Sequence, residues 1–236
     1  LLPHGHEGEE WAAVKLLIIN PNSNDEFTGL IRECAEGAAS PGTDITCVST
    51  PGAPPLIDNY IDEIACGPGM VKIMRENEAS FDAFIVACTC DVNIDILREM
   101  TEKPVAGIGE SSMMAAMMLG GKFSVIQMGP RGIPMKERFV RKLGFESRCA
   151  SVRSIDPAGP GDMADRVIAA ARKAVEEDGA EVLTLGCAGL AGLDERTSRA
   201  VGVPVIDGVL YGVRFAEALA AFGGKTSKKG LYGPDA

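Results

Sequence analysis

The 236-residue chain has few histidines, few aromatic residues and a deficit of positive charge. Its two histidines, His4 and His6, lie near the N-terminus, so no internal histidine accompanies the cysteines to complete a tetrahedral zinc site. Lys and Arg number 23 against 33 Asp and Glu, and the resulting formal charge of −10 repels polyanions. We therefore expect no metal ion and no nucleic acid partner.

Long apolar runs are also missing. No stretch approaches the length of a membrane span, and the N-terminal LLPHGHEGEEWAAV lacks the basic and apolar regions of a signal peptide. Seven cysteines, an odd number, suit a reducing compartment better than a disulfide framework. No phosphate-binding or dinucleotide fingerprint occurs. These absences predict a cytoplasmic protein without membrane contact and without a cofactor.

Short apolar runs alternate with segments of helical periodicity, which predicts an α/β fold with mostly parallel sheets flanked by helices. Eight strands are expected: Lys15–Ile19, Asp44–Ser49, Asp82–Ala87, Pro104–Ile108, Phe123–Gln127, Ser147–Arg153, Glu181–Leu185 and Pro204–Ile206. Seven helices are expected: Glu26–Ala38, Tyr60–Ala79, Ile94–Thr101, Ser111–Leu119, Pro134–Leu143, Asp162–Asp178 and Val209–Phe222.

An internal repeat about a hundred residues apart predicts two pseudo-symmetric lobes with an active site in the cleft between them. DAFIVACTCDVNIDILREMTEKPVAGI resembles AEVLTLGCAGLAGLDERTSRAVGVPVIDG, and each has a strand ending in a cysteine, a turn, a helix and a Pro-Val strand. Chance similarity of two βαβ units is the alternative. We expect residues 14–108 with 208–222 to form the first lobe, 109–207 the second, 1–13 a disordered extension and 223–236 a C-terminal tail.

The repeat sets Cys88 and Cys187 at the carboxyl ends of equivalent strands, where α/β sheets bind ligands. Racemisation of a carbon next to a carbonyl removes a proton from one face and returns one to the other. A thiol titrates near ~8.5, so one cysteine can act as thiolate base while its partner acts as thiol acid. Amides of the following helices are expected to favour the thiolate form.

Free cysteine also serves as a small buried hydrophobe, and this is the interpretation for Cys34, Cys47, Cys66 and Cys149. Cys90 lies two residues beyond Cys88 and can point the same way, but only Cys88 matches Cys187 in the repeat. The paired placement therefore favours Cys88 and Cys187 as the catalytic pair.

Polar residues after other strands are candidates for substrate contact. Asn20, Asn22 and Asn24 follow the first strand, and a helix N-cap there needs only one of them. Ser111 and Ser112 begin a Met-rich helix and are alternatively its caps. Arg131 follows the equivalent strand of the second half, where it either meets an anionic substrate or is a solvated surface residue.

LLIINPNSN, Cys88 followed by Asp91, PVAGIGES, KFSVI, LGCAGLAGL and GVPVIDGV together resemble the hydantoin racemase branch of the aspartate/glutamate racemase superfamily. The motifs run in family order from about residue 15 to about residue 222. The resemblance implies two similar α/β lobes, no cofactor, a homo-oligomer, and Cys88 and Cys187 as the acid/base pair. It implies substrates such as 5-substituted hydantoins or allantoin, contacted by Asn20–Asn24, and by Thr89, Ala188 and Gly189 beside the cysteines.

The run Cys88-Thr89-Cys90-Asp91-Val92-Asn93 departs from the branch, which usually has an aromatic or small residue after the first cysteine and then Asp-Pro. Thr89 resembles the polar residues that amino-acid racemases have there. Three alternatives therefore remain open: an aspartate or glutamate racemase, a maleate-isomerase-like cis-trans isomerase with a nucleophilic cysteine, and a non-catalytic binding protein that senses oxidants through Cys88 and Cys90.

Overall fold

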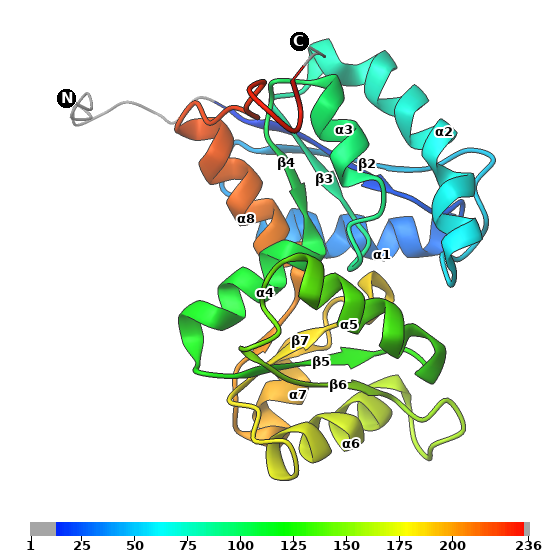
Figure 1. Ribbon diagram of the computed structural model, residues 1–236, viewed down its shortest axis with the longest axis vertical. Coiled ribbons are helices and arrows are strands. Elements are labelled where there is room, and N and C mark those ends of the chain that lie inside the picture. The colour runs from blue at the N-terminus through cyan, green and yellow to red at the C-terminus, as the bar shows by residue number, and fades with distance from the viewer. Residues whose placement is uncertain (1–12, 234–236) are drawn as a thin grey trace.

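The computed structural model describes residues 13–233, which fold around two parallel four-stranded sheets (Figure 1). The first sheet has the strand order β2-β1-β3-β4 and the second has the order β6-β5-β7-β8. Every neighbouring pair is parallel. The two halves thus repeat one topology, which confirms the predicted α/β class with two similar lobes.

The first half contains β1 (Lys15–Asn20), α1 (Asp25–Ala38), β2 (Asp44–Ser49), α2 (Tyr60–Asn77), η1 (Glu78–Ser80), β3 (Ala83–Val86), α3 (Ile94–Met100), β4 (Val105–Gly107) and α4 (Ile108–Leu119). The second half contains β5 (Phe123–Gln127), η2 (Pro130–Gly132), α5 (Ile133–Lys142), β6 (Cys149–Ser154), α6 (Met163–Glu176), β7 (Val182–Leu185), η3 (Ala188–Leu190), α7 (Asp194–Val201), β8 (Val205–Ile206) and α8 (Gly208–Ala221).

All the expected strands and helices occur, with ends that differ by a few residues. Helix α4 begins three residues earlier than its apolar periodicity indicates. The internal repeat predicts a helix in the region of α7 but gives no bounds for it. The sequence DERTSRAV is mostly polar and buries only Thr197, so it has no apolar periodicity to place the helix.

Alternating side chains of the inner strands supply the cores. On β1, Leu16 and Ile18 pack with α1 and α8 on one face, whereas Leu17 and Ile19 pack with α2 and α3 on the other. All four are at most 1% exposed. Period-two alternation buries both faces because helices cover both sides of each parallel sheet. The second sheet repeats this arrangement, with α4 and α5 on one face and α6 and α7 on the other.

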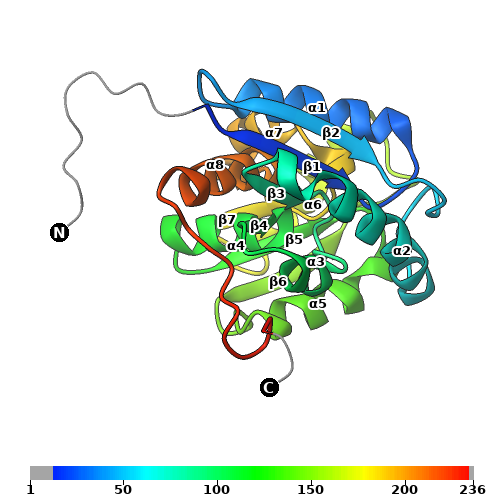
Figure 2. The same cartoon turned by 90° about the horizontal axis from the view of Figure 1, so that it is seen from above.

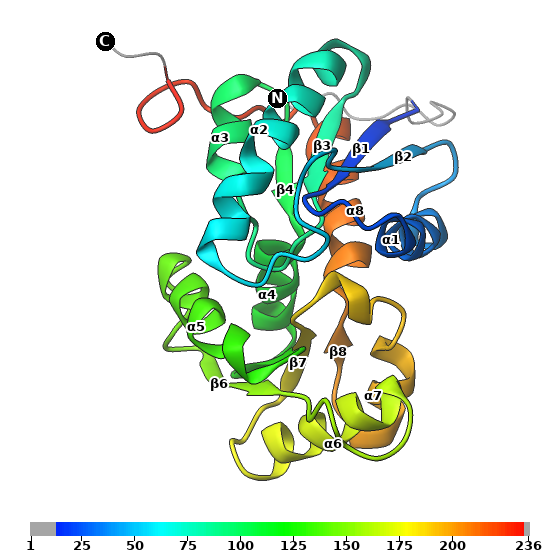
Figure 3. The ribbon, with the colours of Figure 1, turned by 90° about the vertical axis from the view of Figure 1, so that its right-hand side faces the viewer.

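Helices α4 and α8 exchange lobes. Helix α4 follows β4 of the first sheet but packs its Met113 and Ala116 against the second sheet, and α8 follows β8 but packs its Val213 against the first. The two helices lie against each other between the lobes (Figures 1 and 3). This exchange holds the lobes together, and a division into 14–108 with 208–222 and 109–207 remains our proposal.

Past α8 the chain continues along the first half (Figure 2). Thr226 Oγ1 donates to the Lys103 carbonyl at 2.8 Å, Lys228 Nζ donates to the Arg98 carbonyl at 2.6 Å, and Tyr232 donates to Asp95 at 2.8 Å. The described part of the expected tail is thus hydrogen-bonded to α3 and the residues after it. The disordered extension predicted for residues 1–13 lies, except for Ala13, outside the described residues. None of the helices within residues 13–233 has the length and apolar character needed to cross a bilayer.

Candidate active site

Cys88 and Cys187 lie at equivalent places in the two lobes, each two residues past an inner strand, β3 and β7. Both thiols are partly buried, and both line one cavity of about 80 Å³ between the lobes. Because the two sheets present their strand carboxyl ends to this cavity, it receives one cysteine from each half of the chain.

Each of the two thiols accepts a hydrogen bond from a nearby backbone amide. Cys187 Sγ accepts from the amide of Gly189 at 3.4 Å, and Cys88 Sγ accepts from the amide of Cys90. In both halves the donor is the second residue after the cysteine. The Gly189 amide belongs to the first turn of η3, which Cys187 caps, so a short 3-10 helix gives part of the expected support. The α-helices themselves begin further on, α3 at Ile94 and α7 at Asp194.

Burial is the largest influence on both thiols and raises the pKa of each. The Cys90 thiolate, when formed, raises the pKa of both further, and Asp91 does the same for Cys88. The Lys136 ammonium opposes these effects and lowers both pKa values. A thiolate at Cys90 therefore opposes ionisation of Cys88 and Cys187, whereas the Lys136 ammonium favours it.

Cys90 also lines this cavity, whereas Cys34, Cys47, Cys66 and Cys149 do not. Burial raises the pKa of the Cys34, Cys66 and Cys149 thiols to about 11 and that of Cys47 to about 12. These four thiols lie outside the cavity and pack with apolar side chains of the cores, in agreement with packing rather than catalysis.

Lys136 is a cavity residue that the sequence analysis missed. It projects from α5, is 1% exposed, and its Nζ donates to the Thr89 carbonyl and, at 2.8 Å, to Thr89 Oγ1. Thr89 Oγ1 in turn donates to the Gly186 carbonyl, next to Cys187. The helical spacing contained the relevant pattern, because Lys136 shares a buried face with Phe139 and Val140 at positions i+3 and i+4.

Gln127 is a second cavity residue that was missed. It is the last residue of β5, and its buried Oε1 has no hydrogen-bond partner within the described part of the chain. A Cβ on Gly186 would lie 3.1 Å from this oxygen, so the open acceptor is next to the peptide that precedes Cys187. An unpaired buried acceptor is costly unless a ligand supplies a donor.

The three asparagines at the end of β1 and in the loop after it have different surroundings. Asn20 is fully buried and donates to Asn22 Oδ1 and Thr28 Oγ1, both at 2.9 Å. Asn24 is the N-cap of α1 and accepts from the amides of Glu26 and Phe27. Only Asn22 lines the cavity, so Asn20 and Asn24 shape the loop that presents it.

Among the other predicted contacts, Thr89, Ala188 and Gly189 line the cavity, whereas Ser111 and Ser112 do not. Both serines are buried in α4, and Ser112 Oγ donates to the Gly109 carbonyl at 2.8 Å. Their position inside the helix leaves them out of the proposed site. Arg131 is mostly exposed and pairs with Asp58 at 3.5 Å, as a surface residue does.

The loop after Cys88 is held by α4. Asp91 and Asn93 have positive φ, 48° and 58°, and the Asp91 carboxylate accepts from the amides of Gly109 at 2.8 Å and Glu110 at 2.7 Å. Burial, followed by the nearby Glu110 carboxylate, raises the pKa of Asp91 to about 7. In the run from Cys88 to Asn93, where the branch usually has Asp-Pro, side-chain hydrogen bonds and not a proline therefore fix the loop.

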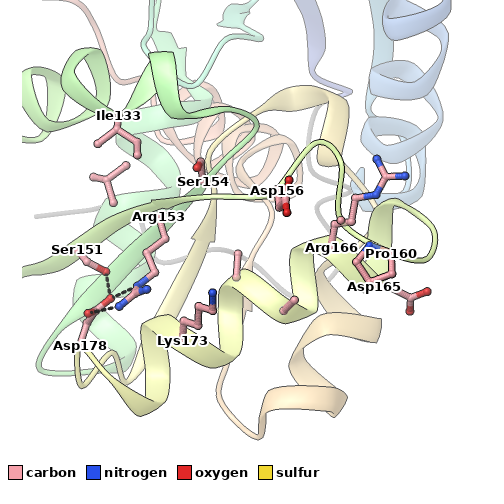
Figure 4. Close-up of a pocket in the computed structure, with 14 residues that line it drawn as sticks. Ile133, Ser151, Arg153, Ser154, Asp156, Pro160, Asp165, Arg166, Lys173 and Asp178 are labelled. Carbon is pink, nitrogen blue, oxygen red and sulfur yellow. Dashed lines mark hydrogen bonds and ion pairs between the residues drawn. The ribbon is translucent and has the colours of Figure 1, made fainter.

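A larger hollow of about 700 Å³ lies elsewhere, between β6 and α6 (Figure 4). Arg153 and Asp178 in its wall pair with each other at 2.5 Å, and no cysteine of residues 13–233 lines it. The same described residues contain no group of three or more His, Cys, Asp or Glu placed to hold a metal ion. The smaller cavity, with its two thiols, is therefore the candidate active site.

These features define a class of protein: a two-lobed α/β fold with a cysteine from each lobe at one cavity. The family model for Asp/Glu/Hydantoin racemase matches residues 16–216, and the chain belongs to this family and is an isomerase. It is similar to a hydantoin racemase of Pseudomonas sp. strain NS671, with 39% identity over 93% of this chain and 91% of that protein.

Two solved structures have the same fold. An allantoin racemase from Klebsiella pneumoniae has a TM-score of 0.89 and 32% identity over 94% of each chain. An allantoin racemase from Pseudomonas fluorescens has a TM-score of 0.87 and 32% identity over 94% of this chain and 97% of its own.

Replacing Cys90 with glycine is expected to change racemase activity less than tenfold, which is less than about 1.4 kcal/mol in the barrier. The reason is that glycine keeps the backbone amide that bonds Cys88 Sγ and reproduces Gly189, the equivalent residue in the other half. Steady-state kinetics of Cys90→Gly and Cys90→Ser would check this. A loss in both variants as deep as that of Cys88→Ser would give the Cys90 thiol a catalytic role.

Proposed function

We propose that this enzyme racemises the ring carbon of a five-membered ureide, a small 5-substituted hydantoin or allantoin, without a cofactor, with Cys88 and Cys187 as the acid/base pair. The observation that carries the proposal is the placement of two thiols, from equivalent strand ends of two lobes, at one cavity. The family and the hydantoin and allantoin racemases similar to this chain support the same substrate class.

In the proposed reaction, one cysteine as thiolate removes the proton from the ring carbon. The electron pair moves onto the neighbouring carbonyl oxygen to give an enolate. The other cysteine, as thiol, then returns a proton to the opposite face, and the two sulfurs have exchanged protonation states. Product of the opposite configuration leaves, and a proton exchange with water restores the starting state.

The cavity size bears on the substrate. Its 80 Å³ is well below the roughly 300–1,000 Å³ of pockets for drug-sized ligands. The unpaired Gln127 Oε1 offers an acceptor to a ring N–H, which a ureide has on either side of a carbonyl. The small volume favours a compact ring over one with a bulky 5-substituent, and the unpaired acceptor favours a ring with N–H donors. A homo-oligomer in the cytoplasm remains part of the prediction.

Chiral chromatography of enantiopure allantoin, 5-methylhydantoin, aspartate and glutamate incubated with the enzyme tests the proposal. We expect loss of optical purity with a ureide and not with the amino acids. The cis-trans isomerase alternative is tested by incubating the enzyme with the cis-diacid maleate and measuring the fumarate formed. Retention of configuration in both ureides would contradict the proposed function.

A further inference from the structure

Lys136 carries a charge that has no carboxylate partner. It is 1% exposed, and within the described residues no Asp or Glu oxygen lies within ion-pair distance of its Nζ. Its contacts are the Thr89 carbonyl, Thr89 Oγ1 and the face of Phe139, whose ring centre lies 5.7 Å away. A buried ammonium held only by neutral groups is unfavourable unless a negative charge forms nearby.

The cavity supplies that negative charge. Cys88 and Cys187 both interact electrostatically with Lys136, and each has its pKa lowered by the ammonium. Other titratable or charged groups act around them: Cys90, Asp91 and Glu110 near Cys88, and Glu63, Arg138 and Lys142 toward α2 and α5. The Lys136 ammonium also lowers the pKa of the Asp91 and Glu63 carboxyls. The Asp91 carboxylate is bound by two amides of α4, however, and Lys136 lines the same cavity as the two thiols, so the ammonium can pair with a thiolate formed there.

We propose that Lys136 is a positioning residue of the racemase site, a fixed cation that stabilises one thiolate of the Cys88/Cys187 pair in either direction of turnover. The inference rests on the proposed two-thiol reaction. Because Lys136 belongs to α5 of the second half and bonds Thr89 of the first, it lies between the two cysteines' loops and serves both. One ammonium and one thiolate sum to zero charge, whichever sulfur is ionised.

Thr89 holds this cation in place. Its carbonyl and hydroxyl receive two of the three ammonium protons, and its hydroxyl proton goes to the Gly186 carbonyl beside Cys187. The polar residue that departs from the hydantoin racemase pattern is therefore the partner of a lysine on another helix. The third ammonium proton remains for the thiolate or for the enolate oxygen of the substrate.

Alkylation of the two thiols by iodoacetamide, followed by peptide mass spectrometry, tests the role of the charge directly. Only thiolate reacts, so the modification rate at a fixed pH below the thiol pKa falls as that pKa rises. Loss of a nearby opposite charge raises the pKa of a thiol. For Lys136→Met we therefore expect Cys88 and Cys187 to be modified about 10- to 1,000-fold more slowly than in the wild type.

Two variants separate charge from packing. Lys136→Arg keeps a cation and is expected to restore most of the modification rate. Thr89→Val keeps the carbonyl that binds Lys136 but removes the hydroxyl bridge to Gly186, so we expect a smaller slowing than in Lys136→Met. A purely structural role of Lys136 predicts equal slowing in Lys136→Arg and Lys136→Met. That result, or unchanged rates in Lys136→Met, would overturn the inference. If Lys136→Met does not fold, as judged by circular dichroism, Lys136→Gln is measured in its place.

The readout is independent of turnover. Should the wild type racemise no ureide, the proposed function fails while the alkylation rates still report on Lys136. Should Lys136→Met keep both its alkylation rates and its racemase pH profile, the role of Lys136 fails while the two-cysteine reaction stands.

Discussion

Serine at either position 88 or position 187 is expected to lower kcat for ureide racemisation by about 10²–10⁴-fold, the usual contribution of a positioned acid or base. Each sulfur serves as base in one direction and as acid in the other, so neither can replace its partner. A serine hydroxyl fits the same space but does not ionise near neutral pH. Chiral chromatography of initial rates in both directions measures the effect.

The matched control is Cys149→Ser, a substitution of the same kind on β6, away from the cavity. Its activity should stay near that of the wild type. Turnover in deuterated water adds a second criterion, because a two-base reaction places solvent deuterium in the product enantiomer before the remaining substrate exchanges. Full activity in Cys88→Ser or Cys187→Ser would contradict the two-thiol proposal.

Alanine at position 107 is expected to lower the free energy of unfolding by about 2–5 kcal/mol, through a steric clash and the loss of a helix cap. A Cβ there would lie 2.1 Å from Cγ of Asp91. The clash would move the Asp91 carboxylate away from the Gly109 and Glu110 amides at the start of α4. Urea unfolding followed by circular dichroism measures the change.

The equivalent helix of the other half, α8, is capped in a different way. Helix α8 has its own N-cap, Asp207, which accepts from the amides of Val209 at 2.8 Å and Gly192 at 2.7 Å. At the equivalent place before α4 stands Gly107, and the carboxylate comes instead from Asp91 in the neighbouring loop. An aspartate carboxylate thus binds amides at the start of both helices, although the two aspartates come from different positions in the sequence.

A double substitution tests this exchange. Gly107→Asp combined with Asp91→Gly should recover most of the stability that either single change loses, because aspartate would cap α4 as Asp207 caps α8. Position 107 has extended backbone, φ −102°, which aspartate adopts, and position 91 has φ 48°, which favours glycine. Gly29→Ala, with open space around it in α1, is the control and should be neutral or slightly stabilising. Additive losses in the double variant would contradict the exchange.

Periodicity was sufficient for the fold because each strand is short, buried and bounded by turn residues. The repeat located Cys88 and Cys187 because both follow equivalent strands. Ligands of α/β folds bind at the carboxyl ends of strands, so functional residues lie at such positions. Helix α7 lacked an apolar stripe and so could not be placed from its sequence DERTSRAV. The start of α4 was missed because its cap, Asp91, comes from another loop.

The candidate site was predictable where residues adjoin the cysteines and not where they come from distant helices. Thr89, Ala188 and Gly189 follow from sequence adjacency alone. Lys136 and Gln127 lie on segments whose contact with the cysteines depends on how the lobes meet. Ser111 and Ser112 looked equivalent to the asparagine loop by position after a strand, but α4 begins before them and buries both.

The amino-acid sequence by itself determined the two-lobed α/β class, because local periodicity and an internal repeat are properties of the chain. Its ordered motifs indicated the racemase family, and the repeat predicted the pair of cysteines. Tertiary structure alone decided which polar groups surround those cysteines. The exchange of α4 and α8 brings the two strand ends to one cavity, and there α5 adds Lys136 to Thr89 of the other lobe. A charge acts over distance in space, so its partner cannot be identified from separation along the chain.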